Sequence, residues 1–161
     1  MASFVDTFSG AAPDLSYTRL AGPAPGITTT GSRGTCSGSF TSVNNRADVD
    51  AGSADMFAEL EITSAFTDDD RSIGVFTRCD GTTTVPRGYQ FDVNQQNQRY
   101  RFGYFTAGAY TNITGFVAFT FTVPCKIRLE SEGNQHRVYV GTWTDTAGKN
   151  AALVATYLVA R

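Results

Sequence analysis

The sequence has little of what would point to a nucleic acid, a membrane or a secretory route. Its 161 residues include two lysines against 11 arginines, and the formal net charge of −2 gives no basic excess to attract nucleic acid. No apolar run approaches the roughly 20 residues that span a bilayer. The opening MASFVDTFSG lacks the basic start and apolar core of a signal peptide. We therefore expect no nucleic-acid partner, no membrane partner and synthesis in a reducing cytoplasm.

Residues that bind metals or act in covalent catalysis are also scarce. The sequence holds one histidine and three cysteines, which are His136, Cys36, Cys79 and Cys125. The cysteines are odd in number and form no C-x-x-C pair, so we interpret them as small buried hydrophobic residues. The acidic stretches 48–55 and 68–70 do not follow the spacing of a calcium-binding loop. We predict no metal site and no cofactor.

The residues that are abundant favour β-structure. Threonine occurs 22 times and leucine six times, and aromatic residues make up 12% of the chain. Beyond residue 55, apolar and polar residues alternate with period two between turn-type residues such as Asp80-Gly81 and the Glu-Gly-Asn at 132–134. This alternation predicts strands over 56–66, 72–79, 89–93, 99–105, 116–123, 125–131, 136–143 and 152–159.

Eight or more short strands joined by short turns predict an all-β protein built as an antiparallel two-sheet sandwich. We predict one domain over residues 1–161, with a loop-rich N-terminal third, because residues 10–54 are dense in Gly, Pro, Ser and Thr. The segments near 53–58 and 149–155 are the only candidate helices.

Three segments in this order resemble a known superfamily. They are FVDTFSG at 4–10, IGVFTRCD at 73–80 with GYQF at 88–91, and IRLESEGNQHRVYVG at 127–141. Together they resemble the concanavalin A-like lectin/glucanase superfamily, also called laminin-G-like jelly rolls, and in particular its variants in bacteriophage head and tail proteins. The resemblance covers most of residues 4–143 and implies a jelly-roll sandwich. Such hairpins often carry an Asn that Tyr139-Val140-Gly141 lacks, and the last strand is expected to close the sandwich differently or to pair with a neighbouring chain.

The residues do not favour an enzyme. Glucanases of this superfamily carry three alternating carboxylates in an E-x-D-x-x-E motif, and the nearest match here consists of Glu59, Glu61 and Ser64. Because the third carboxylate is missing, no residue on this strand is a candidate to protonate a leaving group. His136 lies on the apolar side of its strand, and no G-x-S-x-G motif precedes it. We predict no catalytic residue.

Arginine and aromatic residues alternate to the outward side of three predicted strands. These candidate interface or ligand residues are Arg99, Arg101, Arg128, Arg137, Tyr139 and Trp143. Two interpretations stay open. In the first, the arginines pair across strands with Glu130, Asp92 and the Glu59/Glu61 pair, at about 0.2–1 kcal/mol each. In the second, the residues form a protein interface or a sugar-stacking surface. The choice depends on whether the three strands are neighbours.

These observations favour a non-enzymatic bacteriophage virion structural protein. We expect a capsid decoration (minor capsid) protein, or else a small tail protein, made in the host cytoplasm and located in the virion. Its partners would be capsid or tail proteins, and it would form a homo-oligomer. The alternative is a carbohydrate-binding module, in which Trp143 and Tyr139 stack on a sugar ring and the partner is a glycan.

Overall fold

The computed structural model describes residues 17–21, 28–29, 34–35, 44–47, 54–65, 72–82, 85–144 and 149–159. The chain divides into two compact units, one made of residues 1–53 with 80–86 and the other of residues 54–79 with 87–161. The single domain expected over 1–161 stays a prediction. Cys36, the acidic stretch 68–70 and most of the stretch 48–55 lie outside the described residues.

Short strands characterise the first unit. Strand β1 (Tyr17–Ala21) pairs antiparallel with β4 (Asn44–Ala47), and β2 (Thr28–Thr29) pairs antiparallel with β3 (Gly34–Thr35). Strands of this length follow from the composition, because clusters of Gly, Pro, Ser and Thr interrupt extended runs.

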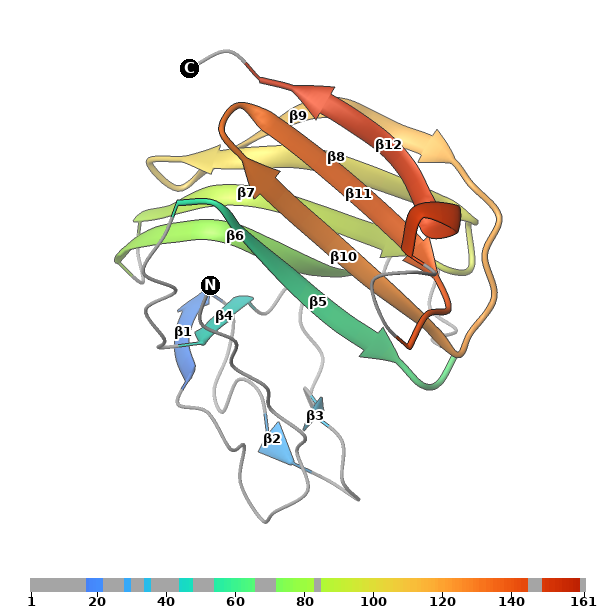
Figure 1. Cartoon of the computed structure of the whole chain (residues 1–161). Helices are drawn as coiled ribbons and strands as arrows, with labels where there is room; N and C mark the ends of the chain where they lie inside the picture. The colour runs from blue at the N-terminus through green and yellow to red at the C-terminus, as the bar shows by residue number, and fades with distance from the viewer. Residues whose placement is uncertain are drawn as a thin grey trace. The chain divides into compact units, whose positions relative to one another are not determined.

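The second unit holds two four-stranded antiparallel sheets that face each other (Figure 1). The first, here called the β10 sheet, has the order β12-β11-β10-β5, with β5 at Met56–Ile62, β10 at Cys125–Glu132, β11 at Gln135–Gly141 and β12 at Leu153–Leu158. The second, here called the β8 sheet, has the order β6-β7-β8-β9, with β6 at Ile73–Thr82, β7 at Val85–Asn94, β8 at Arg99–Thr106 and β9 at Ala109–Ala118. The end of β6 from residue 80 and the start of β7 through residue 86 are counted with the first unit. The predicted antiparallel two-sheet jelly-roll sandwich is confirmed.

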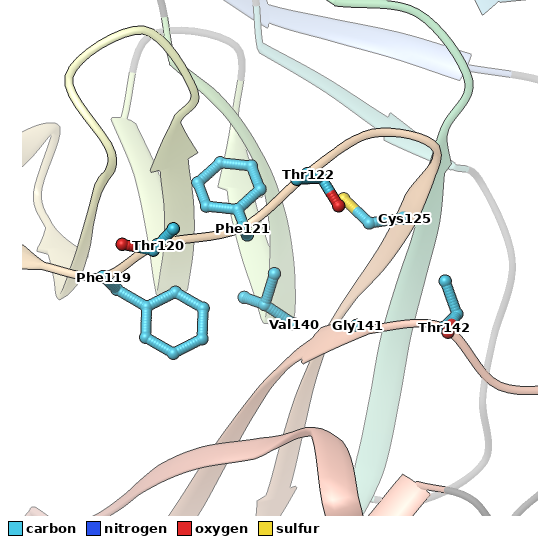
Figure 2. Close-up of a pocket in the computed structure, with 8 residues that line it drawn as sticks. All are labelled: Phe119, Thr120, Phe121, Thr122, Cys125, Val140, Gly141 and Thr142. Atoms are coloured by element: carbon cyan, nitrogen blue, oxygen red, sulfur yellow. The ribbon is translucent and has the colours of Figure 1, made fainter.

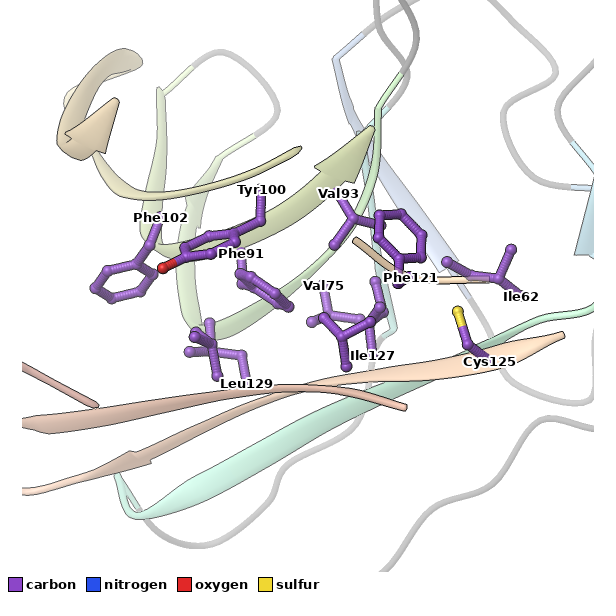
Figure 3. Packing of buried hydrophobic residues seen from close by; sticks show 12 residues of the cluster. Ile62, Val75, Phe91, Val93, Tyr100, Phe102, Phe121, Cys125, Ile127 and Leu129 are labelled. Atoms are coloured by element: carbon purple, nitrogen blue, oxygen red, sulfur yellow. The ribbon is translucent and has the colours of Figure 1, made fainter. Parts of the chain in front are cut away.

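Alternate residues of both sheets form the core between them (Figure 3). The side chains without exposed surface include Phe91, Val93, Phe102, Ile127, Leu129 and Val138. Each of these side chains contributes about 1.5–3 kcal/mol by leaving water. The period-two alternation therefore has a direct physical cause, since each strand buries every second side chain against the facing sheet.

A tight hairpin turn starts β9 earlier than the sequence predicted, at Ala109. Ala107 and Gly108 have φ angles of 51° and 80°, and they connect Thr106 to its partner Ala109. Positive φ at both central residues is the signature of a type I′ turn, whose twist matches the flanking strands. Ala-Gly is a weaker signal for this turn than Asn-Gly, so the first part of β9, before residue 116, was missed.

Several boundaries predicted from the sequence are wrong, among them the end of the strand expected over 56–66, which is at Ile62, and the start of the strand expected over 89–93, which is at Val85. The strand expected over 116–123 ends at Ala118, although Phe121 beyond it is still buried in the core. Asp80-Gly81 does not form a turn, because β6 continues through Thr82. The turn at Gly133 is confirmed, with a φ angle of 54° between Glu132 and its partner Gln135.

The last strand closes on its own chain. Strand β12 pairs antiparallel with β11, from Gln135 opposite Leu158 to Tyr139 opposite Leu153. A single turn of 3-10 helix, η1 (Asn150–Ala152), precedes it at the place where a weak helix was expected. The other candidate helix, near 53–58, is instead the start of β5. In the described part of the chain, no helix is both long enough and apolar enough to cross a membrane.

Candidate functional site

The six candidate residues lie on two different sheets. Arg128 belongs to β10, and Arg137 and Tyr139 belong to β11, with Trp143 just after that strand. Arg99 and Arg101 belong to β8 in the opposite sheet. Whether the three strands are neighbours was left open by the sequence, and β8 does not pair with β10 or β11. Each sheet has to be considered separately.

On the β10 sheet, the aromatic residues do not form an open platform. Tyr139 and Trp143 point away from the main core, as alternation predicts, but they pack with Ala152 in a small second cluster. Their exposed fractions are 3% and 8%, so neither ring offers a free face to a sugar. Trp143 Nε1 donates a hydrogen bond to Glu59 Oε2 at 3.1 Å. The sugar-stacking role expected for this pair has no exposed surface to support it.

The charged residues of the β10 sheet neutralise one another. Arg128 lies directly opposite Glu59, with Nε 2.8 Å from Glu59 Oε2, and its Nη1 donates to Glu130 Oε1 at 3.2 Å. Glu130 also accepts hydrogen bonds from Tyr139 and Lys149. Burial would raise the pKa of Glu130, but the hydrogen bonds from Lys149 and Tyr139 lower it below its usual range. This network fits the cross-strand pairing interpretation.

Arg137 also has an acidic partner. Its Nη1 donates to Glu132 Oε2 at 2.9 Å, on a part of β11 that is open to solvent. The hydrogen bond to Glu132 raises the pKa of Arg137, which therefore stays fully charged.

His136 is a core residue. It has no exposed surface, and its ring centroid lies 3.9 Å from that of Tyr89. Its Nδ1 lies 2.8 Å from Ser131 Oγ, which is 2.6 Å from Thr77 Oγ1. This hydrogen-bonded chain joins β11, β10 and β6 through the sandwich interior. Since a substrate cannot reach His136 there, its surroundings are those of a structural histidine.

On the β8 sheet, a buried carboxylate lies beneath an arginine. Asp92 on β7 is directly opposite Arg101 on β8, and Arg101 Nη2 donates to Asp92 Oδ2 at 2.8 Å. Asp92 is 1% exposed. Burial raises the pKa of the Asp92 carboxyl above its usual range, and the hydrogen bond and charge of Arg101 only partly offset that effect.

An exposed phenylalanine lies beside this pair. Phe116 on β9 is directly opposite Arg101 and is 50% exposed. The guanidinium carbon of Arg99 lies 3.9 Å from the centroid of the Phe116 ring, and that of Arg101 lies 5.0 Å from it. The Arg101 guanidinium also lies 4.7 Å from the ring centroid of Tyr110. Two cations thus contact one exposed aromatic surface.

Several polar atoms in this region lack hydrogen bonds. Among the described residues, Asp92 Oδ1, Tyr110 Oη and Arg99 Nε are buried and have no hydrogen-bond partner. Burial and then the charge of Asp92 raise the pKa of Tyr110 to about 12, so its hydroxyl stays protonated. Buried polar atoms are normally satisfied, so each of these atoms calls for an explanation such as an ordered water, an ion or a bound group. We define the β8–β9 site as Asp92, Arg99, Arg101, Tyr110 and Phe116.

Sequence reasoning identified Arg99 and Arg101 but missed Tyr110 and Phe116. The first part of β9, residues 109–115, was not predicted, so Tyr110 had no assigned face. Phe116 was placed in a predicted strand, and its parity opposite to Val117 would have marked it as outward. Asp92 was considered only as a pairing partner.

A shallow hollow lies at one end of the sandwich (Figure 2). The extended segment after β9 and the end of β11 form its walls, and its volume is about 220 Å³. Its lining residues are Phe119, Thr120, Phe121, Thr122, Cys125, Val140, Gly141 and Thr142. The hollow holds no charged side chain, and burial raises the pKa of the Cys125 thiol. Among the described residues, no three His, Cys, Asp or Glu side chains gather where they could hold a metal ion.

Comparison with known proteins identifies a fold and no family. No family model matches the chain, and no curated protein matches it. A solved structure, the carbohydrate-binding module CBM66 from Bacillus subtilis, is similar to it with a TM-score of 0.65 and 18% sequence identity. The similarity covers 92% of this chain and 83% of that one. The chain therefore has the jelly-roll, concanavalin A-like fold, which this carbohydrate-binding module shares.

Proposed function

We propose that the protein is a non-catalytic carbohydrate-binding module that binds its glycan on the β8–β9 site. The observation that carries the proposal is the half-exposed Phe116 ring with the guanidinium groups of Arg99 and Arg101 against it. A sugar ring has an apolar face of C–H groups and a rim of hydroxyls. It therefore needs an aromatic surface with charged hydrogen-bonding groups beside it, which is the usual composition of a small-ligand site.

The fold supports this proposal without deciding it. The solved structure with a similar fold is named as a carbohydrate-binding module. One fold can serve many functions, so the similarity alone does not assign this one. No comparison supports a virion role. A capsid decoration or tail function, a homo-oligomer and a location in the virion stay predictions from the sequence.

The surroundings of Glu59 support a function without catalysis. Glu59 contacts Lys126 at 3.5 Å, Arg128 at 2.8 Å and the Trp143 indole at 3.1 Å. Both carboxylate oxygens are thus engaged within the sheet, Oε1 by Lys126 and Oε2 by Arg128 and the Trp143 indole. Ser64 also stands where the glucanase motif has its third carboxylate.

A binding experiment with two matched variants tests the proposal. The wild-type protein is screened on a glycan array, and the affinity for any glycan found is measured by calorimetry. We expect Phe116→Ala to weaken that affinity at least about tenfold, as loss of a well-packed aromatic contact does at binding sites. Phe57→Ala is the control, since Phe57 is 42% exposed and has the Arg128 guanidinium 3.9 Å from its ring, but on the other sheet.

The possible outcomes are distinct. Loss of binding in Phe116→Ala alone supports the β8–β9 site. Loss in Phe57→Ala alone would move the site to the β10 sheet, and an array without any bound glycan would contradict the proposed function itself.

A further inference from the structure

The charges of the β8–β9 site are not balanced. Arg101 is paired with Asp92, but Arg99 forms no ion pair with any residue that the structure describes. The Arg99 guanidinium lies against the Phe116 ring instead. No acidic residue occurs on β9, whose sequence is AYTNITGFVA. The site therefore presents one unneutralised cation, although the whole chain carries a formal net charge of −2.

The β10 sheet shows that this imbalance is local. There, every arginine of β10 and β11 has a carboxylate partner, with Arg128 next to Glu59 and Arg137 next to Glu132. Arg99 differs because a ring, and not a carboxylate, lies against it. A guanidinium on an aromatic face keeps its outer N–H donors directed to solvent and available for a bidentate acceptor. Its Nε is buried without a hydrogen-bond partner, as is that of Arg128, so the feature that distinguishes Arg99 is the missing carboxylate.

We propose, on the basis of the function proposed above, that the glycan is acidic and that Arg99 binds its anionic group. The acceptor is a carboxylate or sulfate on a sugar, since both present paired oxygens that match a guanidinium. The exposed part of the Phe116 ring contacts the sugar bearing that group. The Arg101–Asp92 pair stays intact and supplies polar contacts without net charge, so discrimination between acidic and neutral sugars depends on Arg99.

The test compares three oligosaccharides with the same backbone and linkage. One carries uronic acid carboxylates, the second is its carboxyl-reduced neutral form, and the third is that neutral form bearing sulfate esters. Each is titrated into the intact wild-type protein, at low and high salt. We expect an acidic ligand to bind at least about tenfold more tightly than the neutral form, as charge-assisted hydrogen bonds provide, with the difference shrinking as salt rises. Tighter binding of the uronate identifies a carboxylate as the ligand group, and tighter binding of the third compound identifies a sulfate.

Variants of Arg99 make the assignment specific. Arg99→Gln is expected to lose more affinity for the acidic ligands than for the neutral oligosaccharide, so that the ratio of the two affinities falls toward one. Arg99→Lys keeps the charge but not the planar fork, so it is expected to retain part of the preference. The control is Arg137→Gln, which removes an arginine of the other sheet and is expected to change nothing. Thermal unfolding checks that each variant is folded.

Three results would overturn the proposal. Equal affinity of the wild type for acidic and neutral forms would show that Arg99 is not an anion site. A loss in Arg99→Gln that is the same for all three ligands would show that Arg99 only supports Phe116. If neither the three compounds nor any glycan on the array binds, the proposed carbohydrate-binding function fails as well. Failure of the anion site alone would instead leave glycan binding intact without an acidic preference.

Discussion

The substitution Arg101→Met tests how the buried charge of the β8–β9 site is maintained. Asp92 is 1% exposed, and the cation that contacts it is Arg101. Asp92 Oδ2 accepts hydrogen bonds from Arg101 Nε at 3.3 Å and from Arg101 Nη2 at 2.8 Å. Methionine keeps much of the volume of the arginine stem but removes the charge. The variant therefore leaves the Asp92 carboxylate buried without a counter-ion.

The cost follows from the burial of the two partners. Removing one partner of a fully buried ion pair costs about 3–5 kcal/mol. The Arg101 side chain is 26% exposed, and water can partly replace it, so we expect the lower end of that range, about 3 kcal/mol. The same change at Arg137 should cost about 0–1 kcal/mol, because its pair with Glu132 is largely open to solvent.

The stability of Arg101→Met should depend on pH if the buried Asp92 charge causes the loss. Lost packing alone would give a loss that does not change with pH. Burial already raises the pKa of Asp92, and removing Arg101 raises it further. The folded variant then binds a proton more tightly than the unfolded chain, whose aspartates titrate near about pH 3.9. Stability consequently falls as pH rises from that value through the raised folded pKa. The penalty of Arg101→Met is therefore largest at neutral pH and shrinks in mild acid.

Urea unfolding followed by Trp143 fluorescence measures these free energies, since the single tryptophan is buried in the native state. Asp92→Asn combined with Arg101→Met removes the buried charge, and at neutral pH this double variant should be more stable than Arg101→Met alone. A penalty of less than about 1 kcal/mol, unchanged between neutral and acidic pH, would refute the reasoning, because it would place Asp92 in contact with water.

Two further predictions separate structural roles from binding roles. Trp143→Ala should destabilise the protein by about 3–5 kcal/mol, measured by circular dichroism during thermal or urea unfolding, because it empties the cluster with Ala152. It should leave glycan affinity unchanged, and a selective loss of affinity would return the site to the β10 sheet. Gly103→Ala should cost about 1–3 kcal/mol and disturb the site, since a Cβ there would lie 2.5 Å from Tyr110 Oη and would meet the carbonyl of Thr111. Gly115→Ala is its control, because a Cβ there meets nothing within 4 Å. The control should lose only about 1–2 kcal/mol of stability, which is what a side chain costs at positive φ. Glycan binding by Gly103→Ala that equals that of Gly115→Ala would argue against the close contact of Tyr110 with β8.

The sequence by itself determined the fold class and the faces of most strands. Alternation is a local property, since each strand exposes successive side chains to opposite sides whatever its partners are. For that reason Ile127, Leu129 and Val138 were correctly placed in the core, and the turn at Gly133 was predicted from residues next to one another. The same parity placed His136 on the inward side, where it is fully buried.

Only the tertiary structure decided which outward residues share a surface. Strand order depends on pairing between distant segments, such as β5 with β10, and period-two alternation contains no information about it. This is why Arg99 and Arg101 are separated from Arg128 and Arg137, and why Arg101 meets both Asp92 and Phe116 across β7 and β9. Burial of an outward side chain is likewise decided by what packs over it: Trp143 points away from the core, yet Ala152 packs against it.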